Sequence, residues 1–179
     1  MGRQLEQLTQ PLIDFIQNQK IFFAATAMEE GSVNLSPKGL DSLRVISPTR
    51  VVWLNLTGSG NETAIHLKHK NRITLMFCAF EGNPIILRLY GRATAFQKGT
   101  DFWKEHISLF PKIPGSRQLM DVEIDKVQIS CGMGVPLMEY KGQRQSLIDW
   151  AIDKGDEGLN AYWKKKNTSS IDGYTDTFE

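Results

Sequence analysis

Short runs of apolar and β-branched residues, separated by turn residues, fill most of the chain between residues 21 and 133. Runs of this kind, bounded by Gly, Pro, Asn and Ser, are typical of β-strands. Helical segments fall between only some of them, so the regular strand–helix alternation of a parallel sheet is missing. The sequence therefore predicts an α+β fold, a barrel of about six mainly antiparallel strands with flanking helices. The expected strands cover residues 21–27, 33–36, 51–56, 73–80, 85–96 and 122–133.

The two longest expected strands also indicate which side chains share a face. In residues 85–96, two leucines alternate with Arg88, a tyrosine and Arg92, so the two arginines lie on the face opposite the leucines. In residues 122–133 the apolar positions shift by one residue along the strand. Because a strand repeats every two residues, such a shift predicts a β-bulge, which we place near Asp125.

Helices are expected at both ends of the chain and at crossings between strands. The first one contains Pro11, which suits the first turn of a helix. Near the C-terminus, Gly155 is expected to separate two helices. We interpret residues 1–179 as a single domain with an N-terminal helix and a C-terminal helical segment. The expected helices cover residues 5–19, 62–70, 101–110, 145–154 and 158–166.

Charge and hydropathy argue against several classes of partner. The formal net charge of the 179 residues is +1, whereas a nucleic-acid-binding protein needs a clear basic excess for its phosphate contacts. The longest apolar run, residues 75–80, is far too short to cross a bilayer. Residues 1–20 lack the unbroken apolar core of a signal peptide. We therefore expect a cytoplasmic protein with neither a nucleic-acid nor a membrane partner.

Cysteine and histidine give no sign of a metal site or a catalytic group. Cys78 and Cys131 lie in separate apolar runs and are expected to be buried free thiols. Together with three scattered histidines they do not form metal-ligand spacing, so no metal is expected. No G-x-S-x-G or H-E-x-x-H motif occurs, and the catalytic residues stay unassigned.

The segment Ser36-Pro37-Lys38-Gly39 follows an expected strand and ends in a loop. Pro37 has a fixed φ and no N–H, and Gly39 tolerates positive φ. These residues could shape a turn against which a flat ring lies. Lys38 would then offer a positive charge to a phosphate or to an electron-rich ring edge. An ordinary polar turn is the alternative interpretation.

A glycine-rich loop, Thr57-Gly58-Ser59-Gly60-Asn61-Glu62-Thr63, leads into an expected helix with Asn61 as its N-cap. Amides and hydroxyls at a helix N-terminus are suited to bind an anion. The loop lacks the closing Gly-Lys-Ser/Thr of a Walker motif and the spacing of a dinucleotide-binding fingerprint, so it predicts neither. A plain surface loop is the alternative.

Arg88 and Arg92 are the third feature that could carry a function. Two guanidinium groups on one face of a barrel strand need an acidic partner or an anionic ligand. The sequence leaves two interpretations open, a ligand contact and a salt bridge at a dimer interface.

Taken in order, these segments resemble the pyridoxamine 5'-phosphate oxidase-related split β-barrels that bind flavin mononucleotide (FMN). The resemblance spans nearly the whole chain and is closest to a branch that differs from the oxidase itself. Its specificity lies in the order of the pieces rather than in any one of them. The pieces are Val33-Asn-Leu-Ser-Pro-Lys-Gly39, Trp53-Leu-Asn-Leu-Thr-Gly-Ser-Gly-Asn-Glu-Thr63, Asn71-Arg-Ile-Thr-Leu-Met-Phe77, Arg88-Leu-Tyr-Gly-Arg-Ala93, Ser130-Cys-Gly132, Val135-Pro-Leu137, Asn167 and Ser170-Ile-Asp-Gly173.

The resemblance implies a split barrel that forms a homodimer, with an FMN site at the dimer interface. Lys38 and its neighbours would line the flavin, and residues 57–63 would hold the ring edge and the phosphate. Arg88 or Arg92 would come from the second chain. The implied cofactor-binding residues are Ser36, Pro37, Lys38, Gly39, Thr57, Gly58, Ser59, Gly60, Asn61, Thr63, Arg88 and Arg92.

One departure from the oxidase pattern bears on the substrate. Where the oxidases carry a phosphate-gripping Ser-Arg-Lys cluster, this chain has Asn61-Glu62-Thr63. The Arg- and His-containing substrate motif of the oxidases is also missing near the C-terminus. We therefore expect a flavin-dependent oxidoreductase of an unidentified small-molecule substrate rather than a pyridoxamine-phosphate oxidase. Because the flavin itself carries hydride or electrons, a missing acid–base motif does not argue against this expectation.

Three other functions stay open at the level of the sequence. The same barrel could store or sense flavin or haem without catalysis. It could use a deazaflavin in place of FMN. It could also form a structural dimer that binds no ligand.

Overall fold

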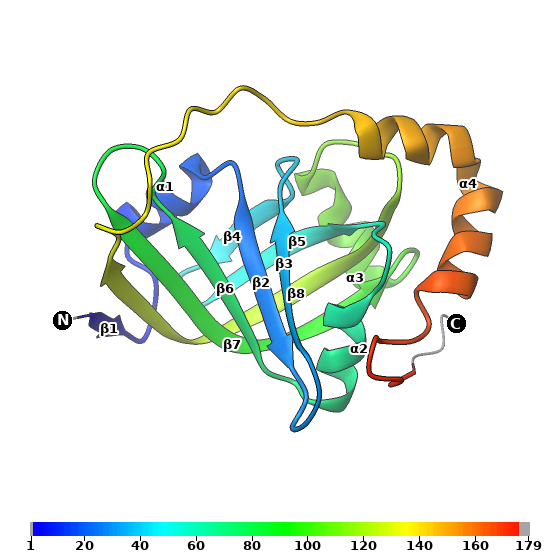
Figure 1. Cartoon of the computed structure of the whole chain (residues 1–179), viewed down its shortest axis with the longest axis horizontal. Helices are drawn as coiled ribbons and strands as arrows, with labels where there is room; N and C mark the ends of the chain where they lie inside the picture. Colours follow the sequence, from blue (N-terminus) through cyan, green and yellow to red (C-terminus); the bar gives the residue numbers. More distant parts are fainter. Residues whose placement is uncertain (1, 176–179) are drawn as a thin grey trace.

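The computed structural model describes residues 2–175, and the eight strands in this range form one antiparallel sheet (Figure 1). The order of strands across the sheet is β3-β2-β6-β7-β8-β5-β4, with β1 paired to β8. The strands are β1 (Arg3–Leu5), β2 (Phe22–Ala27), β3 (Val33–Lys38), β4 (Leu43–Ser47), β5 (Arg50–Leu56), β6 (Ile73–Cys78), β7 (Ile85–Gln97) and β8 (Ser116–Cys131). The helices are α1 (Gln10–Asn18), α2 (Glu62–His69), α3 (Asp101–His106), the 3-10 helix η1 (Ile107–Leu109) and α4 (Ser146–Lys166).

The sheet curls around a core of inward-pointing apolar side chains. At its centre the Trp53 ring meets the edge of Phe22, with ring centroids 6.0 Å apart, and Phe22 stacks on Phe77 at 5.7 Å. Curling brings β3 opposite β5, yet no backbone ladder joins these two strands in the described chain. The barrel is open at that side, so the expected α+β split barrel is confirmed.

The expected bulge at Asp125 is confirmed by the register of β7 and β8. Tyr90 pairs with Lys126, but the next residue, Gly91, pairs with Ile124, so Asp125 has no partner in the ladder. A Cβ atom at position 91 would lie 1.9 Å from the carbonyl oxygen of Glu123. Glycine is therefore required where the bulged strand crosses its neighbour most closely.

Several expected boundaries are wrong. The estimate of about six strands misses β1 and β4. The first helix begins at Gln10 rather than at residue 5, because residues 3–5 pair with β8. Strand β8 starts at Ser116, well before residue 122. Strand β3 continues to Lys38, so Pro37 and Lys38 belong to a strand and not to a turn. Pro37 is tolerated there because β3 is an edge strand.

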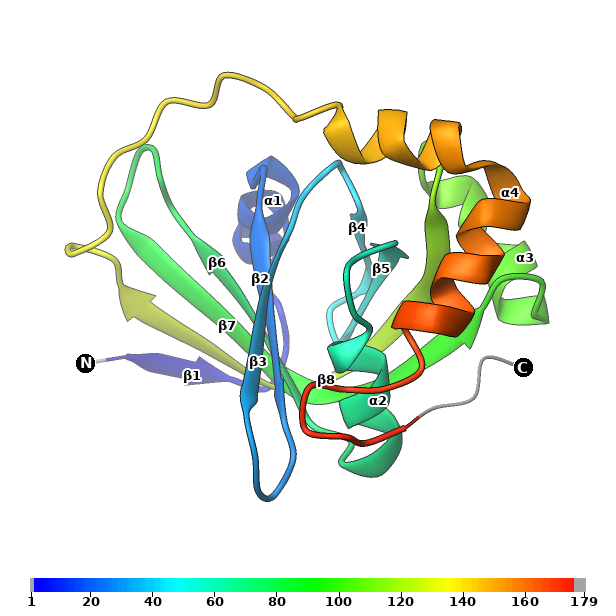
Figure 2. The ribbon, with the colours of Figure 1, turned by 45° about the vertical axis from the view of Figure 1, so that its right-hand side comes forward.

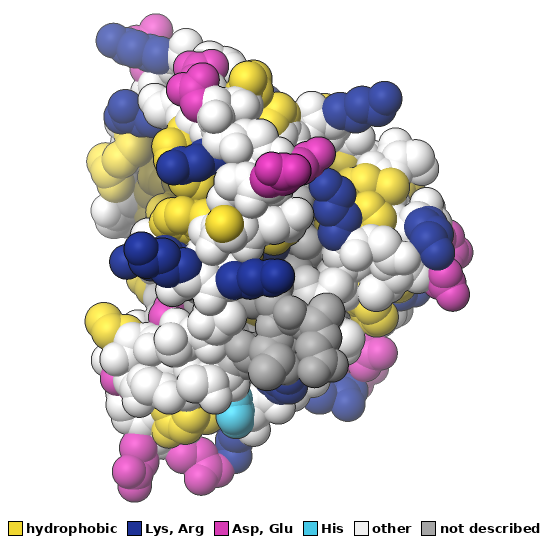
Figure 3. Space-filling view, turned by 90° about the vertical axis from the view of Figure 1, so that its right-hand side faces the viewer, with side chains coloured by type: hydrophobic (Ala, Val, Ile, Leu, Met, Phe, Trp, Pro, Cys, Tyr) yellow, Lys and Arg dark blue, Asp and Glu magenta, His cyan; other side chains and the backbone are white. Residues whose placement is uncertain are grey.

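Helix α3 covers part of the outside of the sheet, whereas α1 and α2 bury apolar residues in the inner core. Trp103 of α3 and Phe110 pack on the outer face of β5 and β8. Helix α4 is kinked at Gly155, whose φ of 61° is non-helical, in agreement with the expected break between two helices. Figure 3 looks onto the side that carries α4, where basic side chains are interspersed with acidic and hydrophobic ones.

Three remaining features of the described chain concern cysteines, membrane spans and metal sites. Both cysteines are free; Cys78 is buried, whereas Cys131 is exposed, so the expectation of two buried thiols is wrong for Cys131. Cys131 is the last residue of β8, where the strand leaves the core. Among residues 2–175 no helix combines the length and apolar character needed to span a bilayer. In the same range no group of His, Cys, Asp and Glu could hold a metal ion.

Candidate functional site

A cavity of about 650 Å³ lies at the open side of the barrel. It is bounded by the inner face of β3, the end of β5, the glycine-rich loop and the first turn of α2. Its volume is within the range of pockets that hold drug- or cofactor-sized ligands. The polar residues that matter most for its chemistry are Asn34, Ser36, Lys38, Asn55, Asn61 and Arg117.

Lys38 is one of three Lys or Arg residues that line this cavity, together with Arg117 and Lys166. It projects from β3, and its Nζ lies 3.5 Å from Oδ1 of Asn55. Burial, with the charge of Arg117 as a second cause, lowers the pKa of Lys38 to about 8. Within residues 2–175 the ammonium group has no carboxylate partner. An ammonium in such a position is well placed to bind an anion.

Arg117 is the second of these residues and comes from the opposite strand, β8. Its side chain is buried, with 3% of the residue exposed. The guanidinium donates to the carbonyl oxygen of Gly60, at 3.2 Å, and to Oδ1 of Asn167. Burial lowers the pKa of Arg117 to about 9, and the neighbouring Tyr162 opposes that shift. A buried charge without a counter-ion is costly, so Lys38 and Arg117 together mark the cavity as a place for an anion.

Several buried polar atoms around the cavity have no hydrogen-bond partner among the described residues. They are Nδ2 and Oδ1 of Asn61, Oε2 of Glu62, Nε2 of His66 and Nε of Arg117. Asn61 precedes α2 as expected, but its side chain makes no capping hydrogen bond. Oε2 of Glu62 and Nε2 of His66 lie 3.6 Å from each other. Because buried polar groups are nearly always satisfied in folded proteins, the amide of Asn61 and Nε of Arg117 are suited to hydrogen-bond a polar ligand.

We expect Lys38→Met to raise the thermal stability of the ligand-free protein at about pH 7, because it removes a buried charge. Between the folded pKa of about 8 and the ordinary value of 10.5, the unfolded chain binds this proton more tightly. Wild-type stability therefore rises with pH across that window, and the advantage of the variant shrinks. Melting temperatures of both proteins along a pH series test this, and a constant difference at all pH values would contradict it.

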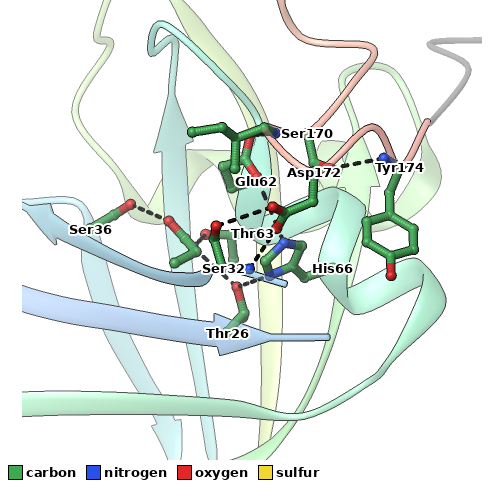
Figure 4. A network of polar contacts seen from close by, with 11 residues as sticks. Thr26, Ser32, Ser36, Glu62, Thr63, His66, Ser170, Asp172 and Tyr174 are labelled. Atoms are coloured by element: carbon green, nitrogen blue, oxygen red, sulfur yellow. Dashed lines mark hydrogen bonds and ion pairs between the residues drawn. The ribbon is translucent and has the colours of Figure 1, made fainter. Parts of the chain in front are cut away.

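A chain of hydrogen bonds forms one wall of the cavity (Figure 4). Nδ2 of Asn34 donates to the hydroxyls of Thr26 and Thr63, both at 3.0 Å. Oγ of Ser36 donates to Oδ1 of Asn34, also at 3.0 Å. The Thr26 hydroxyl lies 3.2 Å from Nδ1 of His66, which is fully buried. These bonds connect β2, β3 and α2, so they hold the wall of the cavity in one arrangement.

Residues 167–175, here named the clasp, run back from the end of α4 across the outer side of the cavity (Figures 1 and 4). The carboxylate of Asp172 accepts hydrogen bonds from the amide and the hydroxyl of Ser32, at 2.7 and 3.1 Å. The amide of Ile171 donates to Oε1 of Glu62 at 3.0 Å. The clasp is thereby attached to both the β2–β3 turn and α2, and it forms part of the cavity wall.

The structure brings most of the expected cofactor-binding residues together. Ser36, Lys38, Gly58, Ser59, Gly60, Asn61 and Thr63 all line the cavity. Thr57 lies behind the wall, where its hydroxyl donates to the carbonyl oxygen of Gly115 at 2.7 Å and accepts from the Trp163 indole at 2.9 Å. Pro37 and Gly39 border a neighbouring cavity instead. Alternation along β3 explains this, since Pro37 faces away from Ser36 and Lys38.

Arg88 and Arg92 lie on the outer face of β7 and do not line the cavity. Nη1 of Arg88 donates to Oγ of Ser130 at 3.3 Å. Arg92 lies 3.4 Å from a Glu123 oxygen and 3.3 Å from an Asp125 oxygen. In a single chain these two arginines are therefore separated from the other expected residues.

Sequence reasoning missed Arg117. It quoted Asn34, Asn55 and parts of the clasp among the segments of the family resemblance but gave them no role at the site. Asn34 alternates with apolar residues along β3, and this two-residue period was a usable signal. Arg117 stands just before the apolar part of β8, outside the strand expected from residue 122. Asn55 donates to Oε1 of Gln118 at 3.1 Å across the β5–β8 ladder, a contact that depends on strand pairing.

The pattern that defines the pyridoxamine 5'-phosphate oxidase family matches residues 8–131. A pyridoxamine 5'-phosphate oxidase family protein of Aspergillus flavus, ustO, is 32% identical over 188 residues, which cover 94% of this chain and 75% of ustO. Among solved structures, a Lactobacillus delbrueckii protein provisionally described as a pyridoxamine 5'-phosphate oxidase has a TM-score of 0.55 and 18% identity over 69% of this chain and 94% of its own. HupZ of Group A Streptococcus has a TM-score of 0.53 and 20% identity, and the match covers 67% of this chain and 91% of HupZ.

At such low identity the two solved structures establish the fold alone. The family pattern and the Aspergillus flavus relative go further, since both extend over most of the chain. The matched residues 8–131 include the strands that frame the cavity, together with Lys38, the glycine-rich loop and Arg117. The chain therefore belongs to the pyridoxamine 5'-phosphate oxidase family.

Proposed function

We propose that this protein binds FMN in the cavity at the open side of the barrel and acts, as a homodimer, as a flavin-dependent oxidoreductase on a small molecule. The observation that carries the proposal is the pair of cationic side chains, Lys38 and Arg117, that border one cavity without ion-pair partners in the described chain. FMN is a large polar ligand with a phosphate, so it would supply the missing anion. Membership of the family supports the choice of a flavin.

The residues present fit this cofactor. Arg117 would hold the phosphate together with the glycine-rich loop, whose Gly60 carbonyl it already contacts. Lys38 would face the ring, and the unpartnered amide of Asn61 would hydrogen-bond a polar ring edge. When bound, FMN supplies the hydride or electron transfer, while the protein binds and orients it.

The stretch Asn61-Glu62-Thr63 replaces the cationic cluster with two neutral residues and a carboxylate. It does not exclude a phosphate, because Arg117 brings a positive charge to the loop from another strand. The substrate is a separate matter. The oxidases' Arg- and His-containing motif is missing from the sequence, so pyridoxamine 5'-phosphate is not part of the proposal.

Purification of the protein without added cofactor tests this proposal. We expect a yellow protein with a flavin absorption spectrum, and a released ligand with the mass of FMN. A Soret band would instead identify haem, and the mass of a deazaflavin would identify the alternative cofactor. A colourless protein that FMN does not stabilise thermally would leave a ligand-free structural dimer as the better interpretation.

The homodimer in this proposal is supported by the outer face of β3. This strand is one edge of the sheet, and it exposes 73% of Val33 and 60% of Leu35 at the rim of the cavity. An apolar edge strand open to water is a liability that proteins usually cover. A second copy placed here would cover it and complete the cavity.

Leu35→Glu is expected to shift the protein from dimer to monomer and to weaken FMN binding, because it places a charge on the apolar edge. Sedimentation and FMN titration of the variant give both results. Ile152→Glu is the matched control, since Ile152 is 62% exposed on α4, away from the cavity. A Leu35→Glu protein that stays dimeric with wild-type FMN affinity would refute this interface.

A further inference from the structure

A second place for a ligand lies beneath the segment that joins β8 to α4. Residues 132–145, here named the strap, contain neither helix nor strand and arch over the top of the barrel (Figures 1 and 2). The strap is attached below by the amide of Met138, which donates to the carbonyl oxygen of Phe80 at 3.0 Å. Nε2 of Gln143 donates to the carbonyl oxygen of Lys20 at 3.3 Å.

Two adjoining cavities lie between the strap and the barrel. The first, of about 700 Å³, has an apolar lining that includes Phe15, Phe23, Phe80, Ile85 and Met138. The second, of about 390 Å³, is lined by Lys20, Lys38 and Arg144 around the ring of Tyr140. Lys20, Ile21 and Tyr140 line both, so the two cavities form the parts of one groove.

The groove has opposite electrostatic character at its two ends. No carboxylate lines the second cavity within the described chain, whereas Glu81 and Glu139 line the first. Lys20 lies 5.9 Å from the centre of the Tyr140 ring, and neither Lys20 nor Arg144 forms an ion pair with any residue in the range 2–175. Cationic groups around an aromatic ring, next to an apolar cavity, match a ligand with an anionic head and an apolar body.

The backbone beside Lys38 is held in an unusual conformation. Leu40, which lines the second cavity, and Asp41 both have positive φ, at 62° and 53°. Arg44 donates to both carboxylate oxygens of Asp41, at 2.8 and 2.9 Å, so that acidic group is already neutralised. Non-glycine residues in this region of φ persist only where their surroundings fix them, and they are frequent at ligand sites.

We propose that the groove beneath the strap binds a small organic carboxylate, with its apolar body in the first cavity and its carboxylate between Lys20 and Arg144. Lys38 lines this groove and also the candidate FMN cavity, so the bound anion would lie next to the flavin. The ligand would therefore be the substrate of the oxidoreductase. That last step rests on the proposed function, whereas binding to the groove does not.

The test uses two probes of equal shape, 2-naphthoate and its neutral amide, 2-naphthamide, titrated against the flavin-free full chain. We expect the wild type to bind the carboxylate about tenfold or more tightly than the amide. The double variant Lys20→Gln with Arg144→Gln should lose that preference and bind the amide as before. Met138→Ser should weaken both probes, because it removes apolar contact from the first cavity.

The inference would be overturned if 2-naphthoate did not bind at millimolar concentration, if the two probes bound with equal affinity, or if the double variant kept the wild-type preference for the carboxylate. A change of oligomeric state in the double variant would also overturn it, because the groove would then hold a second copy. FMN titrations of the same proteins separate the two proposals, since neither Lys20 nor Arg144 lines the candidate FMN cavity. If the wild type did not bind FMN, the proposed cofactor would be refuted, and the proposed carboxylate site would be unaffected.

Discussion

Lys38→Glu combined with Ser59→Asp is expected to abolish FMN retention while the chain stays folded and dimeric. Both residues line the candidate FMN cavity, Lys38 from β3 and Ser59 from the glycine-rich loop. The variant puts two carboxylates where the phosphate and the electron-rich ring would lie, and like charges at a binding site cost several kcal/mol. We therefore expect affinity for FMN to fall by at least about a hundredfold.

The fold should tolerate this variant because the new carboxylate at position 38 stands near Arg117, whose charge lacks an ion-pair partner in the described chain. Flavin content after purification and FMN titration measure the loss, and sedimentation checks the dimer. Lys98→Glu with Ser108→Asp is the matched control. It makes the same change of charge at two exposed positions outside the cavity. Wild-type FMN affinity in the cavity variant would rule out the assigned site.

The parts of the fold that the sequence predicts well are those with a clear local pattern. Strands β2, β6 and β7 alternate between buried and partly buried or exposed residues along most of their length. The slip in phase along β8 placed the bulge at Asp125 correctly. In both cases the burial of one face leaves a period of two residues in the sequence, which can be seen without knowing the partner strand.

Strands β1 and β4 could not be predicted because their pairing, not their composition, makes them strands. Residues 3–5 become a strand by lying beside β8, far along the chain. Strand β4 has no alternation, since four of its five residues are partly buried and its register with β5 is irregular. Without a local period, a short segment of this kind is indistinguishable from a loop.

The residues of the candidate site likewise include some that a local sequence pattern predicts and some that it does not. Lys38 and the glycine-rich loop were found because each is a contiguous motif, whereas Arg117 and the clasp reach the cavity through tertiary contacts. Pro37 was grouped with its neighbours as a turn residue, but in a strand it faces the other side of the wall. Thr57 was grouped with the loop, but its hydroxyl is hydrogen-bonded to the carbonyl oxygen of Gly115 and to the indole of Trp163. Adjacency in the sequence therefore identified the segments that form the cavity wall. It could not tell the residues that face the cavity from those that face away from it.

Arg117 also links the candidate phosphate site to the clasp, since the same guanidinium contacts Gly60 of the loop and Asn167 at the start of the clasp. A phosphate bound to Arg117 would compete with or reinforce these contacts, so the order of the clasp should depend on the ligand. This position makes Arg117 the most informative single residue of the site.

Arg117→Met is expected to weaken FMN binding by about 10- to 100-fold, because charge-assisted hydrogen bonds contribute roughly 1.5–3 kcal/mol each. Riboflavin, which has the same ring and no phosphate, should bind the variant and the wild type alike. Arg117→Lys keeps the charge without the planar guanidinium, so its FMN affinity should lie between that of Arg117→Met and that of the wild type. Titration of each protein with both ligands gives the comparison.

The control is Arg92→Met, whose guanidinium lies beside Glu123 and Asp125 on the outer face of β7. If one chain supplies all the residues that contact the phosphate, Arg92→Met leaves the FMN affinity unchanged. If instead it lowers FMN affinity and spares riboflavin, Arg92 of a second chain contacts the phosphate, and the contribution of Arg88 or Arg92 that the family resemblance implied is then at the phosphate. Equal weakening of FMN and riboflavin by Arg117→Met would place Arg117 at the ring, and the phosphate would then have to lie near Lys38.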